Sequence, residues 1–204
     1  MKTAKTKKSE ESAEQKIIEA ARKLFTEKSF DAVKTRDIAN EAGINLALLN
    51  YYFRSKEKLF EIVMQENMQK FFQSIVGIIN DEETTIKEKV ELLVNRYIDM
   101  LLNSPELPIF VMSNIKNSTR TQFQGRFRDS FLMKQVQKAI KKGKMPDMNP
   151  VNFMLNVVSL TIFPFIGKPM IKNSHNMDDK QFLELIEERR KLVPKWIEAM
   201  MKLK

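Results

Sequence analysis

The sequence predicts an all-α protein, and three observations support that prediction. Glycine is scarce, with 5 among 204 residues, whereas the chain holds 13 methionines and 14 phenylalanines. The strict alternation of apolar and polar residues that marks β-strands is nearly absent. Signals typical of helix starts recur along the chain instead. We therefore expect about nine helices.

Helix starts can be read from capping residues, whose side chains accept hydrogen bonds from N–H groups that the first turn leaves unpaired. Such signals are the capping boxes Ser12-Ala13-Glu14-Gln15 and Thr85-Ile86-Lys87-Glu88, together with a cap at Asp178 through Gln181. Proline at a first helical position, after Ser104 and after Asn149, marks two more starts. Outside residues 35–54, the expected helices span 12–28, 55–79, 85–103, a segment from 104, 121–142, 149–163 and a segment from 178.

Residues 35–53 form a short helix, a turn and a second short helix. Thr35 can cap the first of these helices with its hydroxyl. Gly43 lies where the chain must turn, a position suited to a residue that tolerates positive φ. The apolar residues expected to form the shared core of the two helices are Ile38, Ala39, Ile44 and Leu49. This is the pattern of a helix-turn-helix, whose second helix enters the DNA major groove.

The residues on both sides of this motif sharpen its interpretation. Ala20-Ala21-Arg22-Lys23-Leu24-Phe25 and Phe30 precede it, and Phe53-Arg54-Ser55-Lys56-Glu57-Lys58-Leu59-Phe60 follows. The run from Ile17 to Phe60 resembles the N-terminal domain of the tetracycline-repressor (TetR) family of bacterial regulators. The resemblance covers about 45 of the 204 residues. Three amphipathic helices that pack together without a DNA role are the alternative.

The resemblance implies a division of the chain into three parts. We expect a flexible basic arm at residues 1–11, a three-helix DNA-binding domain at 12–58, and a helical effector-binding and dimerisation domain at 59–204. The arm contains four lysines among the first eight residues and no acid, which suits a phosphate backbone or a minor groove. A solubilising tail is the other interpretation of the arm.

The resemblance also assigns DNA contacts, residue by residue. The positions are Thr35, Arg36, Asn45, Leu46, Ala47, Leu48, Asn50, Tyr51, Tyr52 and Lys56. Thr35 and Lys56 match phosphate contacts, and Arg36 matches a contact to phosphate or base. Phosphate contacts set the register of the protein on DNA, while base contacts specify sequence. The operator is expected to be palindromic, with its half-sites in major grooves on one face of the duplex.

The sequence departs from the family at several of these positions. The family often has tyrosine where this chain has Asn50, histidine where it has Tyr52, and polar residues at Leu46 and Leu48. Leucine and alanine can contact only thymine methyl groups, whereas asparagine can make paired bonds to adenine. We therefore expect apolar contacts to thymine to share in specificity, with Asn45 and Asn50 as the polar readers. The alternative for each leucine is that it turns partly into the core of the domain.

The C-terminal part has no local motif that names a chemistry, so its roles come from the resemblance. That resemblance implies a ligand pocket, whose candidates are Met64, Met68, Met100, Phe110, Phe123, Phe127, Phe131 and Phe163. Flexible methionines adapt such a lining to several apolar shapes. For any single candidate, ordinary helical core is the competing interpretation.

The last two long helices are expected to form a homodimer. The helix from 149 is apolar on more than one side, and the helix from 178 carries one apolar stripe that Arg189 interrupts. The resemblance implies that these helices pair across a two-fold axis as a four-helix bundle. The interface residues predicted on this basis are Phe153, Val157, Leu160, Leu185, Leu192 and Trp196. A buried central helix in a monomer is the alternative.

The net charge of +9 is concentrated in two places, the N-terminal arm and residues 116–144. The second cluster holds nine basic residues against Asp129 alone. If Arg120, Arg126 or Arg128 points into a pocket, the ligand is an amphipathic anion such as a fatty acid, held by a charge-assisted bond. A solvated positive face is the alternative.

Several classes of function are disfavoured. The chain has no cysteine and one histidine, His175, which we interpret as a solvated loop residue, so neither a metal site nor a catalytic site is expected. No cofactor is expected, and the chain is not expected to be an enzyme. No apolar stretch follows the N-terminal lysines, and residues 157–166 are too short to span a bilayer, so a cytoplasmic protein without membrane contact is expected.

The prediction for function is a dimeric transcriptional regulator. It is expected to be a repressor that a small, largely apolar or amphipathic ligand releases from a palindromic operator. A DNA-binding regulator without a small-molecule effector, controlled by a protein partner, is the alternative.

Overall fold

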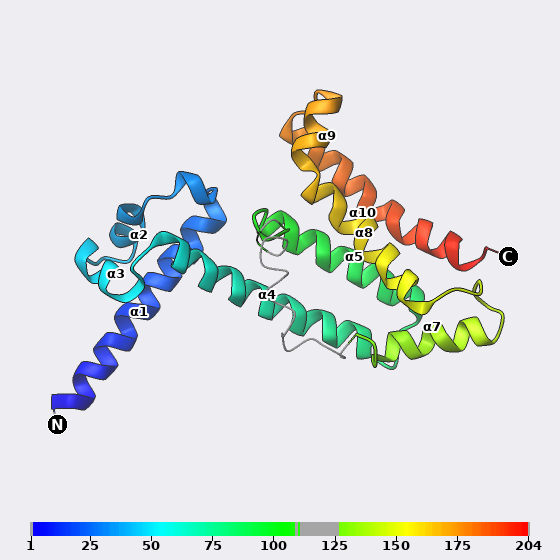
Figure 1. Ribbon diagram of the computed structural model, residues 1–204, viewed down its shortest axis with the longest axis horizontal. Coiled ribbons are helices and arrows are strands. Elements are labelled where there is room, and N and C mark those ends of the chain that lie inside the picture. Colours follow the sequence, from blue (N-terminus) through cyan, green and yellow to red (C-terminus); the bar gives the residue numbers. More distant parts are fainter. Residues whose placement is uncertain (1, 109, 111–126, 204) are drawn as a thin grey trace. The chain divides into compact units, whose positions relative to one another are not determined.

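The computed structural model describes residues 2–108, 110 and 127–203, with side chains from residue 13 onward (Figure 1). Over these residues the chain forms nine α-helices, one 3-10 helix and no β-strand, which confirms the all-α prediction. The chain divides into two compact units, Met1–Lys70 and Phe71–Lys204. Helix α4 contributes residues to both units. The functional division at residues 11 and 58 stays a prediction.

The first unit is a small helical head. Its elements are α1 (Lys2–Glu27), η1 (Phe30–Ala32), α2 (Thr35–Glu41), α3 (Leu46–Phe53) and the first part of α4 (Lys56–Asn80). Helix α1 begins at Lys2 and not at the predicted cap Ser12, because the Lys, Ala and Glu residues before Ser12 also favour helix. The core consists of apolar side chains from every α-helix of the unit: Ile17, Ala21, Leu24, Ile38, Leu49, Leu59 and Val63.

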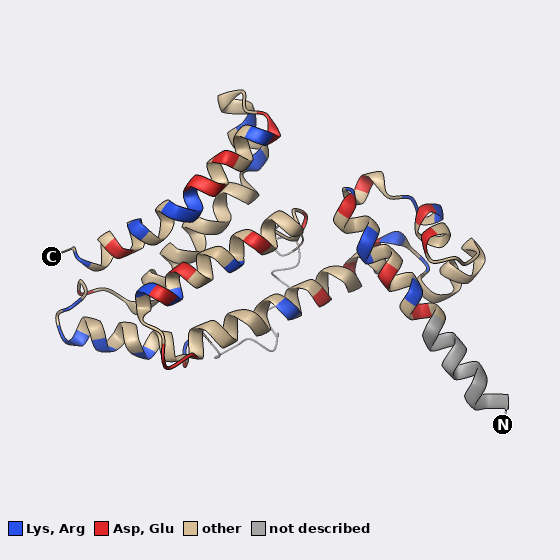
Figure 2. Ribbon diagram, turned by 180° about the vertical axis from the view of Figure 1, so that it is seen from behind, with Lys and Arg blue, Asp and Glu red and all other residues tan. Residues whose placement is uncertain are grey.

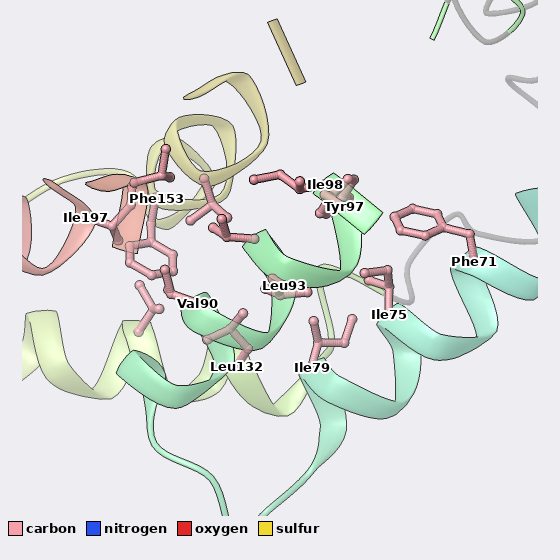
Figure 3. Close-up of a cluster of buried hydrophobic side chains, with 14 of the residues drawn as sticks. Phe71, Ile75, Ile79, Val90, Leu93, Tyr97, Ile98, Leu132, Phe153 and Ile197 are labelled. Carbon is pink, nitrogen blue, oxygen red and sulfur yellow. The ribbon is translucent and has the colours of Figure 1, made fainter. Parts of the chain in front are cut away.

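The second unit contains the end of α4 and five further described helices. These are α5 (Ile86–Asn103), α7 (Phe131–Lys141), α8 (Pro150–Ile166), α9 (Lys168–His175) and α10 (Asp179–Met201). Figure 3 shows Phe71, Ile75 and Ile79 of α4 beside side chains of α5 and α7. Helices α8 and α10 cover another side of α5 with the buried residues Phe153, Val157, Phe182, Ile186, Val193 and Ile197. These contacts make α5 the central helix of the unit.

The predicted caps of α5 and α10 are confirmed. The hydroxyl of Thr85 accepts from the N–H of Glu88 at 3.2 Å, and the Glu88 carboxylate accepts from the N–H of Thr85 at 2.8 Å. Asp178 and Gln181 make the same reciprocal pair at 2.8 and 2.9 Å. The helix predicted from Ser104 falls largely on residues outside those that the structure describes.

Other helix boundaries differ from those predicted. Helix α7 begins at Phe131, because residues 127–130 form a turn and the Ser130 hydroxyl caps the helix by accepting from the Met133 N–H. The part of the predicted helix at 121–126 lies outside the described residues. Helix α8 continues past Pro164, and the chain then re-enters a helix, α9, with Pro169 in its first turn. Proline can occupy the first turn of a helix without the loss of a hydrogen bond, so Pro169 lies at the start of a new helix and does not only follow the end of the preceding one.

His175 is the last residue of α9, which corrects its prediction as a loop residue. Its side chain is exposed, and Nδ1 lies 2.8 Å from the Ser174 hydroxyl and 3.2 Å from the Ile171 carbonyl oxygen. No group of three or more metal-binding side chains occurs among the described residues. In the same residues no single helix is long and apolar enough to cross a bilayer. Only α8 and α9 taken together have the required length and composition, and the two helices are bent by 64° relative to each other.

Lys89 is a fully buried charge that sequence reasoning did not find. Its ammonium donates to the carbonyl oxygens of Asp81 and Thr84 and to the Thr84 hydroxyl, at 2.5 to 2.7 Å. Desolvation lowers the pKa of this ammonium. Gln135 of α7 donates to the same Thr84 carbonyl oxygen at 2.9 Å. Lys89 and Gln135 thereby fix the loop between α4 and α5.

Tyr97 gives the second unit an expected alkaline instability. Burial raises the pKa of its phenol to about 12, from 10.0 for an ordinary tyrosine. The unfolded chain therefore loses this proton near pH 10 while the folded chain keeps it, so stability is full below pH 10 and is lost as the pH rises toward 12. Over this pH range we expect the free energy of unfolding of the wild type to fall by an amount on the order of 2 kcal/mol. Tyr97→Phe should not show this loss. Urea unfolding followed by circular dichroism across the pH series measures it.

The exposed Tyr51 offers a matched control, because Tyr51→Phe removes a phenol of the same chemistry from the surface of the other unit. Parallel pH profiles for wild type and Tyr97→Phe would contradict the expectation.

Candidate nucleic-acid interface

The helix-turn-helix forms as the sequence predicts. Ile38 and Ala39 of α2 and Leu49 of α3 are buried, and Gly43 adopts φ +66° at the turn between them. A side chain at Gly43 would meet no atom within 4 Å, so the positive φ itself is what favours glycine there. The Ala39 carbonyl oxygen accepts from the Ile44 N–H at 3.0 Å, which closes the turn.

Thr35 does not cap α2, which corrects that prediction. Lys34 is the N-cap residue, and Thr35 is the first residue of the helix itself. The Asp37 carboxylate reaches back and accepts from the Lys34 N–H at 2.9 Å. Asp37 thus performs the capping that we expected of Thr35, and a carboxylate there also suits the helix dipole. Thr35 is half-buried, whereas the neighbouring Arg36 is exposed.

Helix α3 presents one face to solvent and one to the core. Asn45, Ala47, Asn50 and Tyr51 are exposed, Tyr51 to 77%, while Leu49 and Phe53 are buried. Leu46, Leu48 and Tyr52 lie between these extremes and are half-buried. The leucines therefore share their surface between core and solvent, as the alternative interpretation of these positions held.

Asn45 and Asn50 differ in what they can offer a base. The Asn45 carboxamide oxygen accepts from the Leu48 N–H at 2.8 Å and so caps α3. Its amide nitrogen remains a donor, but a paired contact to adenine needs the oxygen as well. In the described residues no side-chain hydrogen bond engages Asn50. Asn50 is therefore the better candidate for a paired contact to adenine.

Arg54 is a candidate contact that sequence reasoning missed. It directly follows α3, is exposed, and has φ +54°, which non-glycine residues rarely adopt. Such a conformation costs about 1 kcal/mol or more. The signal that could have found Arg54 was its place beside the recognition helix, together with its permanent charge. Lys34, exposed at the start of α2, is a second basic residue of this kind.

Lys56 lies differently from its prediction as a phosphate contact. Its ammonium donates to the Phe30 carbonyl oxygen at 2.9 Å and to the Val33 carbonyl oxygen at 3.0 Å. The same nitrogen lies 4.0 Å from the centroid of the Phe30 ring. The side chain therefore turns into the head and not outward, which corrects the expected direction of its charge.

The basic cluster of the second unit lies along α7, where Figure 2 shows Lys and Arg positions without acidic ones between them. Lys134, Lys138, Lys141 and Lys142 line an open concave surface of about 390 Å³. Arg128 instead pairs with Asp129 at 3.1 Å on the surface, so it points into no pocket, which corrects that hypothesis. Arg120 and Arg126 lie outside the described residues.

The candidate pocket residues fall into different environments. Met64 is a buried residue of the head, and Met68 is half-buried. In the second unit Met100 and Phe127 pack against the core, with the Phe127 ring centroid 6.5 Å from that of Phe72. Phe110 and Phe131 are half-buried, and Phe123 lies outside the described residues. Phe163 is 54% exposed on α8 and thus lines no interior pocket of the chain, which corrects its assignment.

The candidate dimer residues also separate into two groups. Phe153 and Val157 are fully buried in the chain's own core and cannot contact a second chain, which corrects their assignment. Leu160, Leu185 and Leu192 are half-buried, and Trp196 is 38% exposed. Sequence reasoning missed three exposed apolar residues of α8, namely Val151, Leu155 and Ile166.

Arg189 ties α8 to α10 beside this group. Its guanidinium donates to the Leu160 carbonyl oxygen at 2.7 Å and lies 5.2 Å from the Trp196 ring. Desolvation lowers its pKa. The arginine that interrupts the apolar stripe in the sequence is therefore part of the packing between the two helices.

Comparisons with known proteins agree with this geometry. Residues 17–63 match the bacterial regulatory proteins of the tetR family. The chain is 26% identical over 164 residues, 76% of this chain and 78% of the other, to the Probable HTH-type transcriptional regulator YttP of Bacillus subtilis. It is 26% identical over 102 residues, 50% of this chain and 52% of the other, to the Fatty acid metabolism regulator protein of the same organism.

Among solved structures, a transcriptional regulator of the TetR/AcrR family from Thermobifida fusca has a similar fold, with a TM-score of 0.61. The two are 18% identical, over 89% of this chain and 96% of that one. The helix-turn-helix at residues 35–53 lies inside the segment that matches the family. Residues 17–63 therefore form a DNA-binding domain of the TetR family, in a chain that is similar to transcriptional regulators over most of its length.

Proposed function

We propose that this regulator is a dimeric repressor that binds a palindromic operator and is released from it by a small, largely apolar or amphipathic ligand. The observation that carries the proposal is the exposed face of α3, with Asn50 and Tyr51 open to solvent on a helix that Leu49 fixes to the core. A rigid helix with an exposed polar and aromatic face suits the major groove. Such a regulator would act in the cytoplasm, where the DNA is.

In this proposal the head reads DNA in two ways. Arg36, Lys34 and Arg54 are exposed around the helix-turn-helix and would contact phosphates, joined by Thr35 and the N-terminal lysines. Asn50 would pair with adenine, while Ala47 and the exposed parts of the half-buried leucines would contact thymine methyl groups. Asn45 would contribute only its amide nitrogen.

Dimerisation would use the exposed apolar surface of α8 and α10. Val151, Leu155, Ser159 and Phe163 recur every four residues on α8 and so lie on one side of that helix. Trp196, with the half-buried Leu185 and Leu192, adds the contribution of α10. A two-fold pairing would place this surface against its own copy. We therefore propose a four-helix interface from α8 and α10 of both chains.

The ligand would bind the second unit near Met100, Phe110, Phe127 and Phe131. The relative that regulates fatty acid metabolism supports an amphipathic ligand such as a fatty acid. Helix α4 contributes residues to the head and to the second unit, so a ligand that favours one arrangement of the helices around it would change the separation of the two heads. The ligand can shift DNA affinity only by its differential affinity for the two states.

Selection of bound duplexes from a random pool, at fixed salt, tests the DNA-binding part. A palindromic winner with half-sites about one helical turn apart supports a dimeric reader. A winner without symmetry, or no enrichment, would contradict it. Repression is tested next, by placing the winning duplex over a promoter and comparing transcript levels with and without the regulator.

Asn50→Ala and Arg36→Ala are expected to separate base reading from phosphate contact. Asn50→Ala should remove discrimination at one position of each half-site, worth about 1–3 kcal/mol, without changing the salt dependence. Arg36→Ala, as a phosphate contact, should weaken all duplexes alike and reduce the slope of log K against log salt by about 0.9 for each head. Titrations with singly substituted duplexes at several salt concentrations measure both. Equal losses on all duplexes for Asn50→Ala would refute its role as a reader.

The second candidate function is a regulator controlled by a protein partner. The lysine-lined concave surface of α7 favours it, because an acidic partner surface would complement four lysines without acidic neighbours on the helix. A thermal-shift series with fatty acids of several chain lengths discriminates the two. A rise in melting temperature that grows with ligand concentration supports a small-molecule effector, since a ligand that binds only the folded state stabilises it.

A further inference from the structure

We infer that Lys56 is a positioning residue, which sets the path of the chain into α2 and thereby the pose of the recognition helix, and does not act through contact with DNA. Lys56 is the first residue of α4, where a positive charge opposes the helix dipole. A lysine is therefore expected in that position only if other groups stabilise its charge. The partners that the structure gives it are main-chain carbonyl groups of the head itself.

The two carbonyl groups lie at both ends of a short connecting segment. Phe30 begins η1, and Val33 follows the last residue of η1. The ammonium of Lys56 bonds the carbonyl oxygens of both, at 2.9 and 3.0 Å, and so fixes the segment at two points three residues apart. Val33 is 1% exposed, so its carbonyl group has little water to replace the lysine.

An aromatic cluster joins this contact to the rest of the head. The ring centroids of Phe30 and Phe60 are 4.7 Å apart, and those of Phe25 and Phe60 are 5.2 Å apart in an edge-to-face arrangement. The Lys56 ammonium lies over the Phe30 ring at 4.0 Å. The ring under the ammonium thus packs against Phe60 of α4, which in turn packs against Phe25 of α1, so the ammonium depends on the position of these elements to keep its contacts.

The segment that Lys56 fixes leads directly into the helix-turn-helix. Val33 precedes Lys34, whose N–H bonds Asp37 in the first turn of α2. Helix α2 in turn supports α3 through the buried Ile38 and Ala39. Loss of the ammonium would therefore loosen the start of α2 and, through α2, the orientation of the exposed face of α3.

A positioning residue and a phosphate contact have different salt signatures. Each lost phosphate contact reduces the slope of log K against log salt by about 0.9. A residue that only orients the head changes affinity by a similar factor at every salt concentration and leaves the slope unchanged. The exchange of α2 amide protons in the free protein gives a second readout, which requires no operator and so does not depend on the dimeric repressor that we propose.

The decisive variant is Lys56→Met, which keeps the length of the aliphatic stem and removes the ammonium. Lys58→Met is the matched control, because Lys58 lies in the same turn, is exposed and pairs with Glu61 on the surface. In the full-length protein without DNA, we expect amide exchange at residues 38–42 to rise about tenfold in Lys56→Met, the factor typical of a lost charge-assisted hydrogen bond, and to stay unchanged in Lys58→Met.

On the selected duplex, we expect Lys56→Met to bind about tenfold more weakly at each salt concentration, with the slope of the wild type. Unchanged exchange at residues 38–42 would overturn the inference, as would a slope reduced by about 0.9 for each head. Phe30→Leu provides a second variant if Lys56→Met does not fold. It removes the ring under the ammonium but keeps both carbonyl groups, and it should raise exchange at the same amides, whereas unchanged exchange would again overturn the inference.

Discussion

Leu155→Glu is expected to convert the proposed dimer into a monomer and to reduce operator affinity about a hundredfold or more. Leu155 is 56% exposed near the middle of α8, on the same side as Val151 and Phe163. In a two-fold interface formed by this side of α8, the substitution buries one carboxylate from each chain, and the desolvation of these charges opposes pairing. Two heads on one operator bind far more tightly than one, so the loss of pairing removes that gain.

Sedimentation equilibrium measures the assembly of the variant, and titration of the selected duplex measures its affinity. Leu92→Glu is the matched control, because Leu92 is an exposed leucine of the same unit but belongs to α5. We expect the control to keep the mass and affinity of the wild type. A Leu155→Glu protein that still sediments as a dimer would exclude this side of α8 from the interface.

Phe153→Ala is expected to lower the free energy of unfolding by about 3–5 kcal/mol. The Phe153 side chain is fully buried among residues of α5, α8 and α10, so its truncation leaves a cavity that these packed helices can fill only in part. Urea unfolding at a fixed, low protein concentration measures the change and keeps any contribution from assembly constant.

Phe163→Ala is the natural comparison, because it makes the same chemical change ten residues later on the same helix. Phe163 is largely exposed, so its truncation should leave unfolding of a monomer nearly unchanged and should weaken assembly instead. Equal destabilisation by the two substitutions would contradict the division of α8 into a core side and an interface side.

The sequence predicted most reliably those features that local chemistry determines. The turn at Gly43, the inward positions of Ile38 and Leu49 and the caps of α5 and α10 all follow from neighbouring residues, and the structure contains each of them. The family resemblance was equally local, because it rested on one uninterrupted segment of the chain.

The features that sequence reasoning did not find depend on residues far apart in the sequence. Phe153 and Phe163 are both apolar positions of one helix, and only the packing of α5 and α10 decides which is buried. The family resemblance assigned Lys56 to a phosphate, and no periodic pattern in the sequence indicates that its ammonium meets a carbonyl group 23 residues earlier. The side-chain oxygen of Asn45 is similarly engaged in capping α3, although sequence reasoning assigned Asn45 only as a base contact.

Trp196 gives the molecule an intrinsic optical reporter at one defined place. It is the only tryptophan of the chain, and its indole lies partly open to water on α10, beneath the guanidinium of Arg189. The indole emission of the whole protein therefore originates beside the surface proposed for pairing. Water quenches and reddens such emission, so a second chain that covers the indole would brighten it and shift it to the blue, and the unmodified protein reports its own assembly without an attached dye.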